Sequence, residues 1–320
     1  MRPTLAAAAV TRRCGFIAVI GAPNAGKSSL VNALVGAKVS IVTHKAQTTR
    51  TRIRGVAMEG ETQLVFIDTP GIFTPRRRLD RAMVAAAWGA LENADAILLV
   101  VDAPTRLAIG DGGADAAARR AAAETEAIIE ALSSRGSRPM LVLNKVDRVR
   151  NPDLLPLAES LNRSGAFDET FFVSATGGGG VSELRAHLAA RAPEGPWMYP
   201  EDQLSDISER LTAAEITREK LYLRLHDELP YEATVETDTW ECTKKGELRI
   251  EQTIYVARES HKPIVLGKDG ATIKAIGAAA RVELTELFGA PAHLFLTVKV
   301  RADWADDPAR YRSIGLDIVE

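Results

Sequence analysis

The stretch GAPNAGKSS at residues 21–29 decides the fold of this 320-residue chain. It follows the apolar run FIAVI at residues 16–20 and precedes LVNAL at residues 30–34, so the expected order is strand, glycine loop and helix. Gly21 and Gly26 allow a tight loop whose backbone N–H groups point at phosphate oxygens, and the positive end of a helix dipole follows directly. Because the residue types and the flanking segments agree, we predict a phosphate-binding loop rather than a glycine turn that binds nothing.

Two side chains give this loop its chemistry. Lys27 supplies a mobile positive charge for the β- and γ-phosphates of a nucleotide, and the hydroxyl of Ser28 is placed to bind magnesium. Asn24 occupies the middle of the loop.

Composition excludes several other classes of protein. The chain is 46% apolar and 26% charged, and no run approaches the roughly 18 apolar residues that a membrane span needs. Cys14 and Cys242 are far apart in sequence, which favours reduced thiols in a cytoplasmic setting over a disulfide scaffold or a structural metal site. The length favours two domains, and we expect residues 1–13 to be a flexible tail.

The two halves of the chain differ in charge. Residues 1–199 carry 24 basic and 19 acidic side chains, whereas residues 200–320 carry 16 basic and 23 acidic ones. The whole chain therefore has no simple electrostatic footprint for nucleic acid, and a prediction of RNA binding must rest on a local motif.

Two segments after the phosphate loop resemble nucleotide-sensing loops. In KAQTTR at residues 45–50, Thr48 or Thr49 can complete a magnesium shell once a γ-phosphate is present. In LVFIDTPG at residues 64–71, an apolar strand ends at Asp68, which can reach magnesium, and Gly71 can offer its backbone N–H to the γ-phosphate. We interpret residues 44–50 and 68–78 as two switch loops. Between them we expect an edge strand at residues 52–58 and a second strand at residues 64–68.

The tetrapeptide NKVD at residues 144–147 selects the base. It follows one of two apolar runs, at residues 97–102 and 140–143, which are typical of buried parallel strands. The carboxylate of Asp147 can accept two hydrogen bonds from guanine, whereas adenine offers no such pair. Asn144 can tie the base-binding loop to the phosphate loop, and the stem of Lys145 can lie over the ring. A last strand at residues 170–173 ends in Ser174 and Ala175, whose backbone can contact the guanine oxygen.

The order of these motifs resembles the translation-factor-related GTPases, and the rest of the chain narrows the resemblance to the Era family from about residue 14 onward. This resemblance implies an α/β fold, with a P-loop GTPase domain and a mostly parallel sheet at residues 14–192. Nucleotide-binding residues are expected to be Gly21, Ala22, Pro23, Asn24, Ala25, Gly26, Lys27, Ser28, Ser29, Asp68, Thr69, Pro70, Gly71, Asn144, Lys145, Asp147, Ser174 and Ala175. The magnesium ligands are expected to be Ser28, Thr49 and Asp68, and the catalytic residues Lys27, Thr49, Gly71 and Asn24.

Catalysis should be slow without assistance. Ile72 stands where Ras-like enzymes place a water-orienting Gln, and an apolar side chain cannot orient a water by hydrogen bonding. In related GTPases an Asn at the position of Asn24 helps to hold a potassium ion, so we expect hydrolysis to be stimulated by K⁺. The alternative is that Asn24 only caps the loop.

Pro and Gly at residues 193–196 mark a boundary, and we predict a linker at 193–204 and a KH type-2 domain of α+β architecture at 205–320. After the linker we expect a helix with a capping box at Thr212 and Glu215 and an end at Pro230. AEITREK at residues 214–220 and ELPY at residues 228–231 are similar to the Era signature, but by themselves they indicate only an amphipathic helix.

A hairpin follows at residues 233–241 and 248–257, and then the segment VLGKDGATIK at residues 265–274. Gly267 and Gly270 form a Gly-x-x-Gly loop between two helical segments, which is the arrangement of a KH domain and takes about four nucleotides. A final strand is expected at residues 294–300. The predicted RNA-binding residues are Arg258, Lys262, Val265, Gly267, Lys268, Gly270, Ile273 and Lys274; a helix–turn–helix without a ligand is the alternative.

Two hypotheses of function remain. The first is a GTP-hydrolysing switch that uses Mg²⁺ and binds small-subunit ribosomal RNA to assist assembly of the small ribosomal subunit, as the Era resemblance implies. The second is a GTPase whose C-terminal domain is a protein or membrane adaptor, which the acidic charge of residues 200–320 favours. We expect a cytoplasmic monomer that binds GTP and GDP, with peripheral association at the inner face of the cell membrane as an option.

Overall fold

A computed structural model of the protein describes residues 11–45, 47–110, 113–226, 229–302 and 316. These residues form two compact units. The first unit contains residues 11–39, Ile53–Asp68 and Ala90–Asp206. The second contains Ser40–Arg52, Thr69–Gly89 and the described residues from Ile207 onward. The two switch segments predicted from sequence, 44–50 and 68–78, therefore belong to the same unit as the C-terminal residues. The exception is Asp68, which belongs to the first unit.

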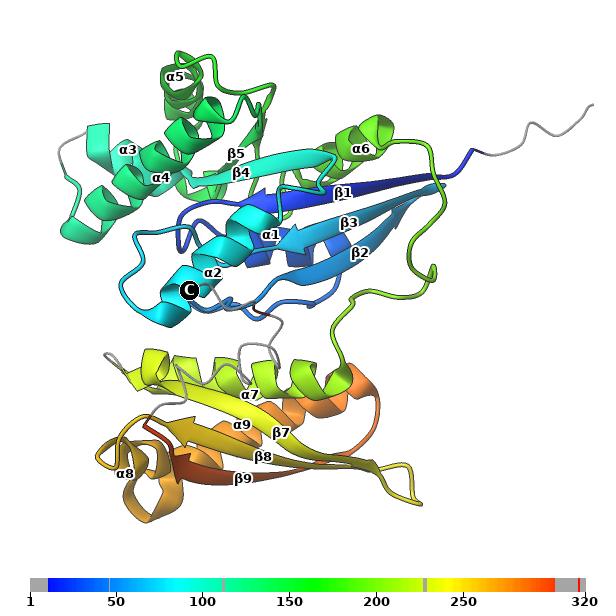
Figure 1. Ribbon diagram of the computed structural model, residues 1–320, viewed down its shortest axis with the longest axis vertical. Helices are drawn as coiled ribbons and strands as arrows, with labels where there is room; N and C mark the ends of the chain where they lie inside the picture. The colour runs from blue at the N-terminus through cyan, green and yellow to red at the C-terminus, as the bar shows by residue number, and fades with distance from the viewer. Residues whose placement is uncertain (1–10, 46, 111–112, 227–228, 303–315, 317–320) are drawn as a thin grey trace, which may run out of the picture. The chain divides into compact units, whose positions relative to one another are not determined.

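The first unit is built on a sheet with the strand order β2-β3-β1-β4-β5-β6. Its strands are β1 (Arg13–Ile20), β2 (Ile53–Glu59), β3 (Thr62–Asp68), β4 (Ala96–Asp102), β5 (Met140–Asn144) and β6 (Thr170–Phe172). Only the pairing of β2 with β3 is antiparallel, so the predicted mostly parallel sheet with an edge strand after the first helix is confirmed. The register places the C-terminal ends of β1, β3, β4 and β5 along one edge of the sheet, where parallel α/β folds form their sites (Figure 1).

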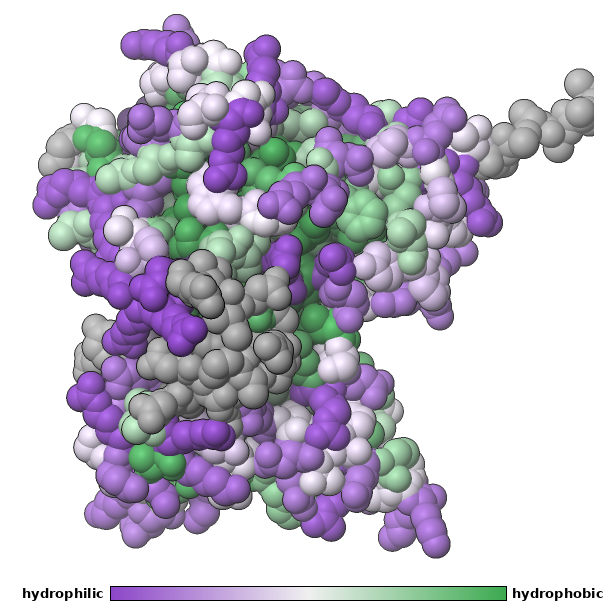
Figure 2. Space-filling view, viewed as in Figure 1, coloured by the Kyte–Doolittle hydropathy of each residue, from purple (hydrophilic) through white to green (hydrophobic). Residues whose placement is uncertain are grey.

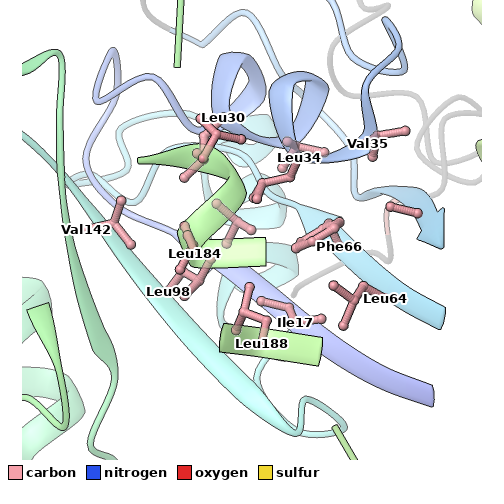
Figure 3. Packing of buried hydrophobic residues seen from close by; sticks show 14 of the residues in the cluster. Ile17, Leu30, Leu34, Val35, Leu64, Phe66, Leu98, Val142, Leu184 and Leu188 are labelled. Carbon is pink, nitrogen blue, oxygen red and sulfur yellow. The ribbon is translucent and has the colours of Figure 1, made fainter. Parts of the chain in front are cut away.

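Helices cover this sheet because its strands are apolar on both faces. They are α1 (Lys27–Val35), α3 (Ala103–Gly110), α4 (Ala116–Ser134), α5 (Asn151–Asn162) and α6 (Val181–Arg191), with a short 3₁₀ helix η1 at Val146–Arg148. Figure 3 shows Leu184 and Leu188 of α6 against Leu98 and Ile17 of the sheet, in the same apolar cluster as Leu30 and Leu34 of α1. Each such fully buried side chain contributes about 1.5–3 kcal/mol, so this cluster fixes α1 and the loop that precedes it.

The segment after α6 is fastened along the edge of the first unit. The buried side chain of Gln63 accepts hydrogen bonds from Met198 N at 2.8 Å and Tyr199 N at 3.0 Å and donates to Tyr199 O at 2.9 Å. Val56 N on the edge strand β2 donates to Leu204 O, and the Arg54 backbone exchanges hydrogen bonds with Asp206. These contacts cover backbone groups that an edge strand otherwise leaves exposed. The residues predicted as a linker are thus held by the first unit as far as Asp206.

The second unit contains a three-stranded sheet in the order β7-β8-β9, with β7 and β8 antiparallel and β8 and β9 parallel. Its strands are β7 (Ala233–Cys242), β8 (Leu248–Val256) and β9 (Ala292–Val300). Its helices are α2 (Arg78–Gly89), α7 (Glu209–Arg224), α8 (His261–Leu266) and α9 (Ala271–Phe288), with 3₁₀ turns η2 (Leu229–Glu232) and η3 (Lys268–Gly270). Helices α7 and α9 run along the sheet (Figure 1), and their apolar side chains pack on it. The predicted hairpin, paired helices and final strand are confirmed.

The start of α7 differs from the prediction. Ser208 caps the helix by accepting a hydrogen bond from Leu211 N, so the helix begins at Glu209 and ends at Arg224, before Pro230. The predicted capping box is wrong, because Thr212 lies inside the first turns and donates to Ser208 O, while Glu215 pairs with Arg218. A Ser with β-region dihedral angles is as good a cap as a Thr, and the predicted capping box left Ser208 out.

In the part of the chain that the structure describes, no helix has the length and apolar character that crossing a bilayer requires. The face shown in Figure 2 is mostly hydrophilic, with apolar side chains in small groups. The predicted tail at residues 1–13 lies largely outside the described residues, and Arg13 already belongs to β1.

Candidate functional site

The loop between β1 and α1 has the backbone shape that a phosphate cradle needs. Gly21 has φ 151° and Gly26 has φ 92°, conformations that side-chain-bearing residues rarely adopt. A Cβ atom at Gly21 would lie 2.4 Å from Val100 O, and one at Gly26 would lie 2.3 Å from Asn144 Nδ2. Both glycines are therefore required by their neighbours as well as by their dihedral angles. Asn24 is exposed and has φ 63°, a left-handed conformation that Asn tolerates better than most residues.

Lys27 is the first residue of α1 and is 5% exposed. Its ammonium donates to Gly21 O at 3.2 Å and to Ala22 O at 3.0 Å, so two of its three donors hold it over the loop. Burial lowers the pKa of Lys27 to about 8, although the negative charge of Asp68 acts in the opposite direction. A bound phosphate would favour the charged form in the same way as Asp68 does.

Asn144, at the end of β5, joins three loops of the first unit. Its Nδ2 donates to Ala25 O at 3.0 Å, and its Oδ1 accepts from Lys145 N at 2.8 Å and from Ala175 N at 3.1 Å. The side chain is 1% exposed, so all of these bonds are made out of water. Asn144 thus ties the phosphate loop to the base-binding loop, as the sequence predicts, and also to Ala175.

The carboxylate of Asp147 is oriented by a hydrogen bond from Ser174. Ser174 Oγ donates to Asp147 Oδ1 at 2.6 Å, and Gly177 N donates to Ser174 Oγ at 2.9 Å. The side chain of Asp147 remains 38% exposed, so it is oriented and still accessible to a ligand. Its other oxygen, Oδ2, lies 3.9 Å from Arg148 Nε, an exposed partner. An oriented and accessible carboxylate is suited to a base that presents two adjacent N–H donors.

Lys145 is fixed beside this carboxylate. It adopts a left-handed conformation with φ 64°, and its Nζ lies 2.5 Å from Asp102 Oδ2 and donates to Asn24 O at 2.8 Å. Because both ends are anchored, the aliphatic stem forms a fixed apolar surface. Asp102, which sequence reasoning did not select, is the partner that orients it.

Asp68 ends β3 and is fully buried. Its register partner on β1 is Val19, which places it beside the start of the phosphate loop. Together with the Ser28 hydroxyl in the first turn of α1, it offers the hard oxygen ligands that magnesium prefers, so the residues present fit that ion. Thr49, Thr69, Pro70 and Gly71 belong to the second unit, and the buried Ile72 lies there too.

The threonines at 48 and 49 are not equivalent. Thr48 Oγ1 lies 2.6 Å from Thr43 Oγ1 and donates to Lys45 O at 2.8 Å. The Thr48 hydroxyl is therefore occupied in closing a local turn.

The glycine loop of the second unit connects α8 to α9. Gly267 (φ 73°), Asp269 (φ 52°) and Gly270 (φ 76°) all have positive φ, and Gly270 N donates to Gly267 O at 3.2 Å. A Cβ atom at Gly267 would lie 2.2 Å from Thr272 Oγ1, whereas one at Gly270 would meet only Lys274 Cε, at 3.7 Å. Gly267 is needed for the loop itself, and Gly270 leaves open space at the start of an 18-residue helix.

The predicted RNA-binding side chains differ in exposure. Those of Arg258, Lys268 and Lys274 are exposed, and Lys262 and Ile273 are half-buried. Val265 is fully buried in the core, so its side chain can support the loop only from inside. Its neighbour Ile264 is 55% exposed. The sequence pattern marked position 265 as an apolar flank without showing that position 264 faces outward.

Comparisons with known proteins agree with this geometry. Residues 16–145 match the family described as "50S ribosome-binding GTPase", and residues 228–305 match the family described as "KH domain". The chain is 57% identical over 309 residues to "GTPase Era" of Brucella suis, covering 97% of this chain and 95% of that protein. It is 56% identical over 312 residues to "GTPase Era" of Rhizobium meliloti, covering 98% and 95%.

A solved structure of Era in complex with MgGDPNP and nucleotides 1506–1542 of 16S ribosomal RNA is also similar. It has a TM-score of 0.85 and 36% sequence identity, and the match covers 95% of this chain and 99% of that one. The fold and the first site define a P-loop GTPase followed by a KH domain. Within that class, the chain belongs to the Era family of GTPases.

Proposed function

We propose that this protein is a GTP-driven switch that binds small-subunit ribosomal RNA through its KH domain and assists assembly and maturation of the small ribosomal subunit. The observation that carries this proposal is the presence, on one chain, of the oriented carboxylate of Asp147 and the open glycine loop at Gly270. The similar Era structure that contains both MgGDPNP and a 16S ribosomal RNA fragment supports it. We assign residues 14–192 to the GTPase domain, 193–204 to the linker and 205–320 to the KH domain.

In the nucleotide site, Asp147 accepts the two N–H donors of guanine, and the backbone around Ser174 and Ala175 contacts the guanine oxygen. The Lys145 stem lies over the base. The N–H groups of the loop from Gly21 to Ser29 surround the phosphates, and the remaining donor of Lys27 reaches the β- and γ-phosphates.

Ser28, Thr49 and Asp68 would hold magnesium, which supplies charge neutralisation between the β- and γ-phosphates. Gly71 offers its backbone N–H to the γ-phosphate, so the second switch loop engages the nucleotide only when a triphosphate is bound. In the RNA site, the exposed side chains of Lys268, Lys274 and Arg258 contact phosphates. Because Gly270 has no side chain, the RNA backbone can approach the loop there.

We expect RNA binding and nucleotide state to be coupled. If GTP favours the arrangement that exposes the glycine loop, RNA must raise GTP affinity over GDP affinity by the same factor, because coupling is reciprocal. The expected coupling is about 1–3 kcal/mol, or roughly 5- to 150-fold in RNA affinity. The measurement is RNA affinity of the full chain with a non-hydrolysable GTP analogue and with GDP. Equal RNA affinities in both nucleotide states would show that the two domains bind their ligands independently, and the proposed switch would be wrong.

Potassium should stimulate hydrolysis. With Ile72 in place of a Gln, the intrinsic rate should be on the order of 10⁻⁴ to 10⁻² per second. Asn24 is exposed in the loop, where its side chain can help to hold a potassium ion beside the transferring phosphate. Rates are compared in potassium and sodium chloride at equal ionic strength, for the parent and for Asn24→Ala. Equal rates in the two salts would contradict the proposal. Potassium stimulation that persists in Asn24→Ala would show that Asn24 does not hold the ion.

We further propose that the protein acts as a cytoplasmic monomer, with peripheral association at the membrane as an accessory property. The adaptor hypothesis is not favoured, because the KH family matches residues 228–305.

A further inference from the structure

Helix α7 carries part of the signature segment at residues 214–220, which the proposed function leaves without a role. In the second unit, one face of α7 contacts the segment Ser40–Arg52. The contacting residues are Arg218, Glu219, Tyr222 and, just past the helix, Leu225, which are spaced by three and four residues on one helix face. Glu215, one turn earlier, binds Arg218. The signature therefore marks the face of α7 that holds the first switch segment.

Arg218 fixes this segment at Thr48. Arg218 is 1% exposed, and its Nη2 donates to Thr48 O at 2.6 Å. Its Nε donates to Glu215 Oε1 at 2.8 Å, and the same carboxylate accepts a second bond from Nη2. Burial alone lowers the pKa of Arg218, but the charge and hydrogen bonds of Glu215 raise it above its ordinary value. A buried guanidinium with a bound carboxylate is a rigid donor for a backbone carbonyl.

Arg50 fixes the segment two residues further on. It is 5% exposed, and its Nη1 donates to Ala233 O at 3.0 Å, while its Nη2 donates to Tyr222 Oη at 2.8 Å. The ring of Tyr222 is fully buried, and the Cζ atoms of both guanidinium groups lie close to its centroid, at 5.8 Å (Arg50) and 5.2 Å (Arg218). Thr49 is therefore flanked on both sides by anchored residues.

Two further contacts hold the beginning of the segment. Glu219, 3% exposed, accepts a hydrogen bond from Val42 N at 2.9 Å, and Lys45 Nζ donates to Leu225 O. The backbone of Val42 and Thr48 and the side chains of Lys45 and Arg50 are thus bound to α7 or to the residue that follows it, so the segment is not held only by its own turn.

We propose that Arg218 and Arg50 are positioning residues for GTP binding: they hold residues 48–50 on α7 so that Thr49 is already ordered when a triphosphate and magnesium arrive. This inference rests on the proposed role of Thr49. A segment that is fixed before binding loses less conformational entropy when a ligand engages it. Only the γ-phosphate state uses this segment, so the anchor raises affinity for GTP and leaves affinity for GDP unchanged.

The test is Arg218→Gln in the full-length chain. Affinity for a non-hydrolysable GTP analogue with Mg²⁺ should fall about tenfold, the scale of one lost charged hydrogen bond, while affinity for GDP should change less than about twofold. Both are measured by fluorescence titration with labelled nucleotides. Without Mg²⁺ the difference between parent and variant should disappear, because Thr49 acts through that ion. A purely structural role would weaken both nucleotides alike.

Arg210→Gln is the matched control. Arg210 lies on the same helix and also donates to backbone carbonyls, Thr237 O at 2.8 Å and Asp238 O at 2.7 Å, both outside the first switch segment. The Arg210→Gln substitution should leave the ratio of GTP-analogue affinity to GDP affinity unchanged.

Tyr222→Phe is a second, milder variant, because Arg218→Gln leaves the Glu215 charge buried and can destabilise the fold. It removes only the hydroxyl that Arg50 contacts, and it should lower the affinity ratio about threefold in the same direction. Thermal unfolding shows which variants are folded at the titration temperature. If the folded variants keep the parent's ratio, or raise it, the inference is wrong. The proposed function fails separately, if the parent chain does not bind guanine nucleotides or ribosomal RNA.

Discussion

Replacing Asp147 with Asn should lower GTP affinity about 100-fold and raise affinity for xanthosine triphosphate, since two hydrogen bonds to a charged acceptor are lost and one wrong donor is introduced. Guanine presents N–H donors to this position, whereas xanthine presents an oxygen at C2 that an amide N–H₂ can contact. The effect is large because Ser174 Oγ already binds Asp147 Oδ1 at 2.6 Å and fixes the side chain. A fixed Asn cannot turn away from a mismatched base without losing that bond.

Competition titration with GTP, ATP and xanthosine triphosphate measures the change. Asp153→Asn is the control, because Asp153 lies six residues away, pairs with Arg150 at 2.8 Å and belongs to α5. It should alter none of the three affinities. Unchanged GTP affinity in Asp147→Asn would remove Asp147 from the site and with it the basis for guanine specificity.

The sheet of the first unit was predictable because its signals are local. Apolar runs at residues 97–102 and 140–143 are long enough for strands and carry no helical periodicity; the first ends at Asp102, and Asn144 follows the second. The phosphate loop was predictable for a similar reason, since Gly21 and Gly26 stand at fixed distances from Lys27. In both cases neighbours in sequence carry the whole pattern.

The grouping of the switch segments was not predictable from local patterns. Arg218 and Thr48 are 170 residues apart in sequence, and no periodicity relates them. Arg50 looked like one basic residue among several near the N-terminus, although it is buried and its pKa is lowered by that burial. The role of Gln63 was hidden in the same way, because a polar residue in a strand gives no sign that it binds the backbone at Met198 and Tyr199.

The Gly-x-x-Gly loop was predictable as a loop, but the two glycines have different roles in the structure. The motif suggests that both must be small for the sake of the ligand. The structure shows that Gly267 is small because Thr272 is adjacent, so a substitution there disturbs the loop before any RNA is involved. Gly270 is the position that isolates the effect on RNA.

Gly270→Asp should lower RNA affinity about 100-fold and leave GTP affinity unchanged. The new side chain would stand where the RNA backbone approaches, and its charge would repel phosphate beside Lys268 and Lys274. The fold should tolerate it, because φ 76° is in the left-handed region that Asp and Asn adopt and the nearest contact is 3.7 Å away. The measurement is filter binding of a short 16S ribosomal RNA fragment to the full chain, with nucleotide titration on the same sample.

Gly270→Asn separates the two causes, since it has the same shape without the charge. It should lower RNA affinity about tenfold, and the remaining difference from Gly270→Asp should shrink as salt rises, because phosphate repulsion is screened whereas steric exclusion is not. Equal losses in the two variants at all salt concentrations would assign the effect to shape alone. RNA affinity that survives in both would place the RNA elsewhere on the KH domain, because a ligand bound against Gly270 has no room for either side chain.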